Sequence, residues 1–108
     1  GEQGPGIASH GFELFRRFGC SGCHGAGSTV HAPDLNGLLG RTVHLQDGRS
    51  LVADENYVRD SILLPKKDVV AGYPPIMPSF SGQIMEEDIM AIIEYLRQTG
   101  NEHANIVR

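Results

Sequence analysis

The segment Cys20-Ser21-Gly22-Cys23-His24 carries the strongest signal in this chain of 108 residues. Its two cysteines lie about one turn apart if the segment is helical, so both thiols face the same side. A histidine directly after the second cysteine completes C-x-x-C-H, the spacing at which two thiols bond to the vinyl groups of a c-type haem. The imidazole of His24 is then the expected iron ligand on one side. The motif therefore predicts one covalent haem c per chain.

Cysteines at this spacing also occur in thioredoxin-like redox pairs, in zinc sites and in structural disulfides. Thioredoxin-like motifs open a helix after a strand, whereas here a helical pattern precedes Cys20. A zinc site needs two more ligands, and the chain has no third cysteine. A disulfide between Cys20 and Cys23 would leave His24 without a purpose. The haem interpretation is therefore favoured over the other three.

Length and charge limit the classes of function. A chain of this length forms one domain with a modest core, to which a buried haem would add a large apolar filler. The formal net charge of -4 argues against nucleic acid or an anionic membrane surface as the main partner. The sequence has no run of about 18 apolar residues and no signal-peptide core, and it opens on Gly1. We therefore expect a processed mature chain or an excised domain.

Composition divides the chain into three parts. Residues 1–8 have the composition of a linker, residues 9–100 form the predicted domain, and residues 101–108 form a C-terminal tail. Ser9 is placed to cap a first helix that runs to about Phe18. The apolar residues of this helix are predicted to pack in the core. They are Phe12, Leu14, Phe15 and Phe18.

The most regular helical pattern runs from about Glu86 to Gln98. Its apolar residues form one stripe, its first turn is acidic, and Gly100 is placed to end it. Gly11 in the first helix has no side chain and leaves room for the close approach of another helix. We therefore expect the two terminal helices to cross. The expected contacts are Gly11 and Phe15 on one helix, and Ile92 and Tyr95 on the other.

Three shorter elements are predicted between these helices. Residues 42–52 alternate around Asp47-Gly48, which indicates a β-hairpin with a two-residue turn. Asp54 can cap a short helix over residues 55–64, which ends at Pro65. Residues 70–82 hold too many prolines and glycines for a helix or a central strand and are predicted to form a rigid loop. The predicted fold class is mainly α with one short hairpin.

A haem that carries electrons needs a second axial ligand. Met85 and Met90 lie at or in the last predicted helix, where a methionine usually packs. Met77 lies within Pro-Pro-Ile-Met-Pro, whose prolines restrict the backbone and reduce the entropy lost on binding the metal. Met77 is therefore the predicted ligand opposite His24. The remaining histidines are expected on the surface, with His31 kept as a lesser candidate because it lies near the motif. The others are His10, His44 and His103.

Several segments together resemble the class I cytochromes c. They are Gly11 and Phe15, Cys20 to His24, Pro33 to Arg41, Met77-Pro78 and Tyr95-Leu96. The resemblance implies N- and C-terminal helices that cross beside a covalent haem. It also implies that the Pro33 carbonyl accepts a hydrogen bond from His24, and that Arg41 approaches a haem propionate. Tyr57 and Tyr73 become candidate donors in the haem pocket, although both positions suit ordinary half-buried tyrosines equally well.

A narrower resemblance involves residues 40–57, residues 69–80 and Gly82-Gln83. These segments are similar to the cytochrome c domain fused to the C-terminus of subunit II in some bacterial haem-copper oxidases. The hairpin is the part that ordinary small cytochromes c lack. The sequence departs from that pattern at Met85, where a serine usually caps the last helix, and at Ala32, where glycine often precedes the proline. The first departure weakens the predicted start of the last helix.

The resemblance implies one-electron transfer rather than catalysis by the domain itself. Electrons would come from a soluble donor protein and pass to the dinuclear copper domain of the same subunit, beside the other oxidase subunits. The expected location is the periplasm or the extracytoplasmic face of the bacterial inner membrane, with membrane attachment only through the parent subunit. A free-standing periplasmic shuttle would have the same haem site and stays open. A haem sensor or peroxidase also stays open but would need a displaceable sixth ligand.

Overall fold

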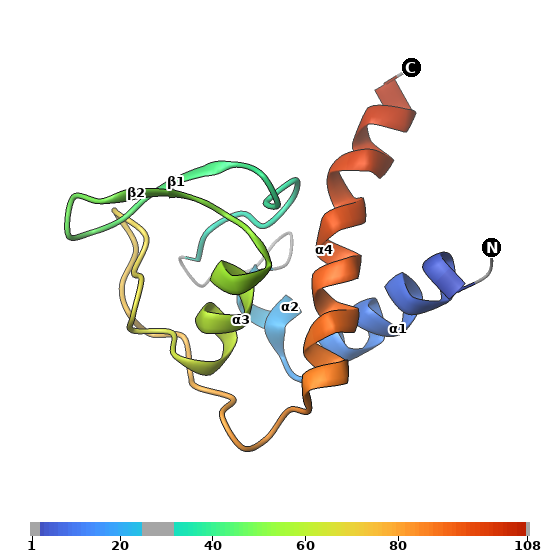
Figure 1. Cartoon of the computed structure of the whole chain (residues 1–108), viewed down its shortest axis with the longest axis horizontal. Coiled ribbons are helices and arrows are strands. Elements are labelled where there is room, and N and C mark those ends of the chain that lie inside the picture. The colour runs from blue at the N-terminus through green and yellow to red at the C-terminus, as the bar shows by residue number, and fades with distance from the viewer. Residues whose placement is uncertain (1–2, 25–31, 108) are drawn as a thin grey trace.

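The computed structural model describes residues 3–24 and 32–107, and within them the chain is mainly helical (Figure 1). The helices are α1 (Gln3–Arg17), α2 (Cys20–His24), α3 (Glu55–Leu63) and α4 (Glu86–Val107). The strands β1 (Thr42–His44) and β2 (Ser50–Val52) form one antiparallel pair. The predicted fold class, mainly α with a short hairpin, is confirmed.

Helices α1 and α4 cross at Gly11, as predicted (Figure 1). A Cβ atom built on Gly11 would lie 1.9 Å from the carbonyl oxygen of Ala91 and 3.0 Å from the Cβ of Tyr95. The ring of Phe15 packs on that of Tyr95, with centroids 5.4 Å apart. The atoms of α4 nearest to Gly11 thus belong to Ala91 as well as to the predicted Tyr95, while Ile92 is buried in the same core cluster as Phe15. The crossing therefore depends on the missing side chain of Gly11.

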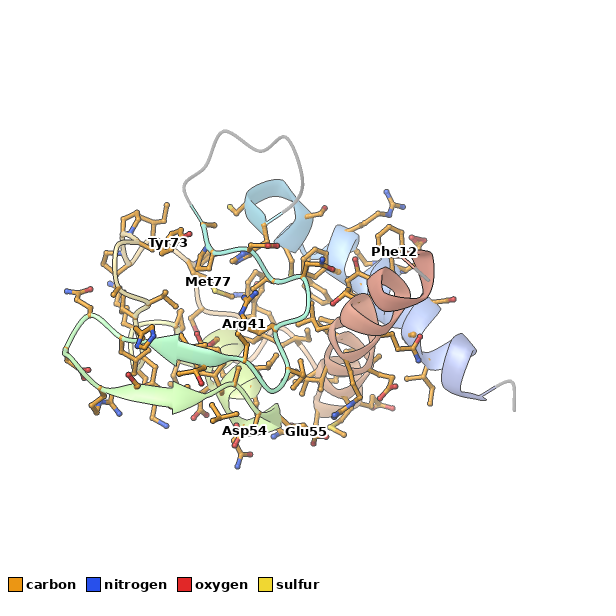
Figure 2. All side chains as sticks on the ribbon, turned by 90° about the horizontal axis from the view of Figure 1, so that it is seen from above. Phe12, Arg41, Asp54, Glu55, Tyr73 and Met77 are labelled. Carbon is orange, nitrogen blue, oxygen red and sulfur yellow. The ribbon has the colours of Figure 1, made fainter. Side chains whose placement is uncertain are left out.

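Phe12 corrects the prediction that all three phenylalanines of α1 pack in the core. Its side chain is 43% exposed and lies on the outer side of the crossing, against Tyr95 and Arg16 (Figure 2). Residues three positions apart differ by about 60° around a helix, so three phenylalanines at this spacing cannot all face one core. Phe15 in the middle is buried, and Phe18 is half buried against Phe80.

Both terminal helices are longer than predicted. Helix α1 begins at Gln3, so Ser9 lies inside it instead of capping it. Pro5 is tolerated there because backbone N–H groups of a first turn have no partner within the helix. At the other end α4 passes through Gly100 to Val107, since one glycine costs a helix only about 1 kcal/mol. The start of α4 is set by the backbone of Met85, whose carbonyl accepts from the N–H of Asp88 and of Ile89, both at 3.0 Å.

The hairpin pairs residues 42–44 with residues 50–52, but its turn is one residue longer than predicted. The N–H of Leu45 donates to the Arg49 carbonyl at 2.8 Å, which leaves three residues in the loop. The N–H of Gly48 donates back to the Leu45 carbonyl at 3.0 Å, and Gly48 has a φ of 95°. This is a type I turn followed by a left-handed residue, a common three-residue hairpin loop. Glycine is placed where a positive φ is required.

Helix α3 and the following loop agree with their predictions. The Asp54 carboxylate accepts from the N–H of Tyr57 at 2.8 Å and so caps α3. Residues 71–82 form no helix or strand, and Val70 makes an isolated bridge with Leu45. The loop is fixed at one end by the N–H of Ala71 on the His44 carbonyl (2.9 Å) and at the other by the N–H of Phe80 on the Ile62 carbonyl (3.0 Å).

The core joins these elements. Leu14, Ile89 and Ile93 are its most deeply buried large side chains and lie on the crossing helices. Buried residues of α3 and of the hairpin extend the same cluster. None of the helices in the described part of the chain is long and apolar enough to cross a membrane.

Candidate functional site

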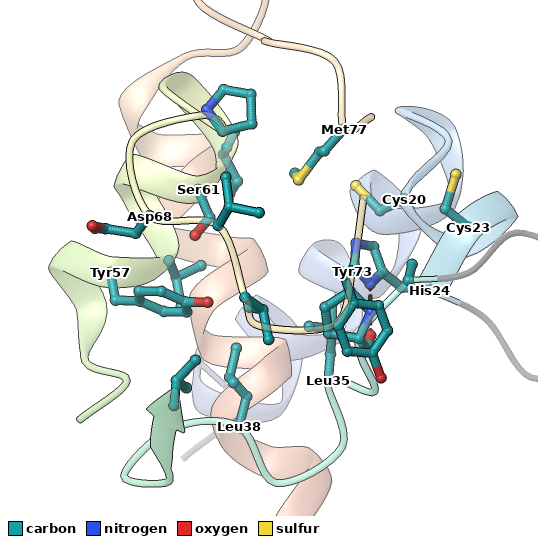
Figure 3. A pocket seen from close by; sticks show the side chains of 18 of the residues that line it. Cys20, Cys23, His24, Leu35, Leu38, Tyr57, Ser61, Asp68, Tyr73 and Met77 are labelled. Carbon is teal, nitrogen blue, oxygen red and sulfur yellow. Dashed lines mark hydrogen bonds between the residues drawn. The ribbon is translucent and has the colours of Figure 1, made fainter. Parts of the chain in front are cut away.

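A cavity of about 660 Å³ lies between α2, the segment 32–41, the hairpin, α3 and the loop 68–80 (Figure 3). Cofactor and ligand sites typically enclose about 300–1,000 Å³ and are mainly apolar. This cavity agrees in both respects, since its lining includes Phe15, Leu35, Val43, Val58 and Ile92. It is therefore large enough for an organic cofactor and is walled mostly by hydrocarbon.

Helix α2 contributes the C-x-x-C-H motif to one wall. Cys20, Cys23 and His24 all line the cavity, and both cysteines are free thiols. Burial is the main cause that raises the pKa of Cys20, with a smaller contribution from the neighbouring Cys23. Reactive redox cysteines instead have a lowered pKa, because the thiolate is the nucleophile. The motif thus presents two thiols and an imidazole to an apolar cavity, and burial keeps the Cys20 thiol protonated.

The imidazole of His24 is held by one hydrogen bond. Its Nδ1 lies 2.8 Å from the carbonyl oxygen of Pro33, as the family resemblance implies. A carbonyl oxygen can only accept, so Nδ1 carries a proton, and in the neutral imidazole the lone pair then lies on Nε2. Such a bond fixes the tautomer and ring orientation of a metal-binding histidine and makes it more basic. His24 is therefore prepared to bind a metal through Nε2.

Met77 lies on another wall of the same cavity. Its side chain is half buried, and its sulfur points into the open space of the cavity (Figure 3). The two other methionines are exposed and do not line the cavity. The structure thus brings together an imidazole and a thioether that lie far apart in the sequence.

The predicted rival ligands are placed elsewhere or are not described. His10 is exposed and lies 3.9 Å from Asp88. His44 lies at the cavity, but its ring is exposed and its Nδ1 is 2.9 Å from the Ser50 hydroxyl. His31 and the side chain of His103 lie outside the described residues. Among those that are described, no three His, Cys, Asp or Glu side chains form a metal-binding cluster.

Arg41 organises the segment that follows Pro33. Its guanidinium donates to the carbonyl oxygens of Asp34 (2.5 Å) and Asn36 (3.1 Å), and the residue lines the cavity. The N–H of Gly37 donates to the hydroxyl of Thr99 on α4 at 3.0 Å, which ties the segment to that helix. These bonds hold the loop that carries the Pro33 carbonyl.

Tyr57 and Tyr73 both line the cavity. Tyr57 is buried, and its hydroxyl points inwards from α3 (Figure 3). Burial raises the pKa of this phenol, and a hydrogen bond with Ser61 partly offsets the effect. Tyr57 therefore stays protonated at neutral pH and can donate.

Ser61 and Asp68 are polar lining residues that the sequence analysis missed. The side chain of Asp68 is only 9% exposed, and its Oδ1 lies 2.7 Å from Nη2 of Arg49 on the hairpin. Neither residue belongs to a recognisable motif. Ser61 could have been found from its position one helical turn after Tyr57 on α3, whereas nothing in the sequence connects Asp68 with Arg49.

The chain matches the cytochrome c family over residues 8–100, a range that includes every residue of the cavity wall named above. It therefore belongs to the cytochrome c family and is an electron-transfer module that works with haem. No curated protein matches the chain.

The residues of the cavity fit haem c. Two free thiols and an imidazole whose Nε2 has no part in the Pro33 bond lie on one wall, a thioether lies on another, and the remaining lining is mostly apolar. Cys20 and Cys23 are placed as a possible attachment pair, with His24 and Met77 as possible iron ligands. When bound, haem iron supplies a reversible one-electron couple whose potential depends on its ligands and surroundings.

Proposed function

We propose that the chain carries one haem c bonded to Cys20 and Cys23, with His24 and Met77 as iron ligands, and that it transfers single electrons. The observation that supports this proposal is the shared cavity, in which the motif of α2 and the thioether of Met77 face a common apolar space. The chain's own residues hold and orient the group, exclude water from it and set its potential.

Each polar residue of the site has a separate role in this proposal. The Pro33 carbonyl orients the His24 ring and makes its Nε2 a better donor to iron. The soft thioether of Met77 favours ferrous over ferric iron and so raises the potential. Arg41 supplies positive charge for a propionate, while Tyr57 and Tyr73 are candidate donors to the same polar groups.

We also propose the electron route of an oxidase. A soluble donor protein would reduce the domain, which would pass the electron to the dinuclear copper domain of a cytochrome c oxidase subunit II. The hairpin supports this proposal, because it forms part of the cavity wall and is the segment that resembles the oxidase-linked domains. The corresponding location is the extracytoplasmic face of a bacterial inner membrane or its periplasm, with membrane contact only through the parent subunit.

The haem proposal is tested by covalent attachment. The chain is produced in a host with c-type haem maturation, and its visible spectrum is recorded before and after denaturation and extraction with acidified organic solvent. We expect the haem to stay with the polypeptide, and to be extracted from the Cys20→Ser/Cys23→Ser double variant. Complete extraction from the unmodified chain would contradict the proposal.

The oxidase proposal is tested at the gene and in solution. We expect the reading frame to encode a copper-binding domain and membrane-spanning segments before Gly1. We also expect the reduced domain to reduce the isolated copper domain faster than it reduces an unrelated copper protein. A gene that encodes this domain alone would favour the free-standing shuttle instead.

A further inference from the structure

Behind one wall of the cavity the hairpin and the loop after α3 share an ion pair. Asp68 lines the cavity with a side chain only 9% exposed, and its Oδ1 lies 2.7 Å from Nη2 of Arg49. Ionised carboxylates are seldom buried to this extent unless they are paired. Arg49 therefore supplies the charge that Asp68 requires at this place.

Arg49 is itself held by its own turn. Its Nε lies 2.8 Å from Oδ2 of Asp47, and its N–H donates to Oδ1 of the same residue at 3.1 Å. The side chain of Asp47 is 56% exposed, so solvent screens its charge. The two carboxylates thus differ, since Asp47 orients the guanidinium in water while Asp68 receives it at the cavity wall.

The charge of Asp68 acts inside the cavity. The phenol of Tyr57, which points inwards, has its pKa raised mainly by burial and additionally by the negative charge of Asp68, while Arg41 acts in the opposite direction. Lys67 also lies near Asp68, but its ammonium is bound to Asp60 at 2.6 Å. Within the described part of the chain, the cation seen in direct contact with Asp68 is therefore Arg49, whose positive charge offsets that of the carboxylate at the cavity wall.

We infer that the Arg49–Asp68 pair sets the reduction potential of the group bound in the cavity, with the hairpin supplying the compensating charge. This inference rests on the proposed function. Each reduction adds one electron from the donor, so the site loses one unit of positive charge until the electron passes to the acceptor. A negative charge at the wall stabilises the oxidised site, and its neutralisation favours the reduced one.

The experiment measures the reduction potential of four holoprotein variants at pH 8. Arg49→Gln leaves the negative charge of Asp68 without its positive partner. It is expected to lower the equilibrium constant for reduction at least threefold, which lowers the reduction potential by about 28 mV at 59 mV per tenfold. Asp68→Asn is expected to raise it by a similar factor. The double variant restores the net charge of the wall and should return close to the unmodified protein. Arg49→Lys keeps the charge and should change the potential least among the single variants.

A control and a second readout separate charge from folding. Arg97→Gln removes the same charge from a pair with Glu55 in which neither residue lines the cavity, and it should leave the potential unchanged. In ¹³C-tyrosine NMR titrations, the pKa of Tyr57 should rise in Arg49→Gln and fall in Asp68→Asn. If the reduction potential shifts no more in Arg49→Gln than in Arg97→Gln, the inference is wrong. The proposed function would still stand in that case, provided that the variants carry a bound c-type haem.

Discussion

At the scale of single residues, the proposed haem site depends on one sulfur atom, which lies in a segment restricted by prolines. Met77 is half buried at the cavity wall, while Met85 is 61% exposed and does not line the cavity. The thioether is a weak ligand, so its contribution depends on being held where the metal binds. The two methionines therefore form a matched pair for testing the sixth ligand.

We predict that Met77→Ala removes the weak far-red absorption band that a His/Met-ligated class I cytochrome c is expected to show. The opened iron should then bind carbon monoxide, whereas Met85→Ala should keep the band and exclude the gas. Spectra of the oxidised proteins, and of the reduced proteins with and without carbon monoxide, provide the measurement. A band that persists in Met77→Ala would rule out this methionine as the ligand.

Gly11 and Gly6 provide a second comparison on one helix. The smallest substitution, Gly11→Ala, places a Cβ 1.9 Å from a backbone oxygen of Ala91, so the helices must separate. We expect a loss of about 1–3 kcal/mol in the free energy of unfolding, as for other overpacked contacts. Gly6→Ala meets no atom within 4 Å and should stabilise α1 by up to about 1 kcal/mol. Denaturant unfolding measures both, and equal effects would contradict the tight crossing.

Residues that act through neighbours in sequence could be predicted, while those that act across the fold could not. The C-x-x-C-H motif and the Asp54 cap are local patterns, so both can be recognised from the sequence alone. Arg49 and Asp68 stand 19 positions apart, and only the folded hairpin brings them together. Burial of Asp68 is likewise a property of the assembled cavity. Sequence therefore predicted the attachment motif and missed the charged residue in the cavity wall.

At the scale of elements, α3 starts where a single carboxylate replaces a missing backbone partner. We predict that Asp54→Ala destabilises the protein by about 1 kcal/mol, the usual effect of losing a cap. In a domain of this size that corresponds to about 4–8 °C in melting temperature. Asp54→Asn keeps the oxygen that accepts from Tyr57 and should melt close to the unmodified protein. A full loss in Asp54→Asn would assign the effect to charge instead of capping.

The ends of the elements show where local patterns fail. Helix α1 begins before Ser9 and α4 passes Gly100, because a capping or ending residue only biases a boundary that neighbouring residues can overcome. The hairpin loop has three residues where two were predicted, and the N–H of Gln46 in this loop donates to the Val69 carbonyl at 2.7 Å. That contact with a distant loop could not be read from Asp47-Gly48. Element type was predictable, and exact boundaries were not.

At the scale of the whole molecule, the formal net charge is -4, and some of the basic residues form ion pairs with neighbouring carboxylates. Arg16 lies 3.0 Å from Glu13, and Lys67 lies 2.6 Å from Asp60. At the rim of the cavity, Ile76 is 59% exposed between prolines. Docking through this apolar rim would therefore receive little long-range attraction from charge.

We predict that the second-order rate of electron transfer with a soluble donor changes by less than about a hundredfold from low to high salt. Strongly steered pairs owe gains of about 10–1,000-fold to their charges and lose them on screening. Stopped-flow measurements over a series of salt concentrations test this expectation. A steeper fall would show that charged residues, and not the rim around Ile76, guide the donor.

The two possible iron ligands belong to different halves of the molecule. His24 is tied through Pro33 and the Gly37–Thr99 bond to the crossing helices, while Met77 lies on a span anchored to the hairpin at Ala71 and to α3 at Phe80. Under the proposed attachment, a rigid group would join the first half by three bonds and the second by one. Local unfolding would then begin in the span between Ala71 and Phe80, which is bound to the cofactor only through Met77. The cofactor would stay attached to α2 while this span opens.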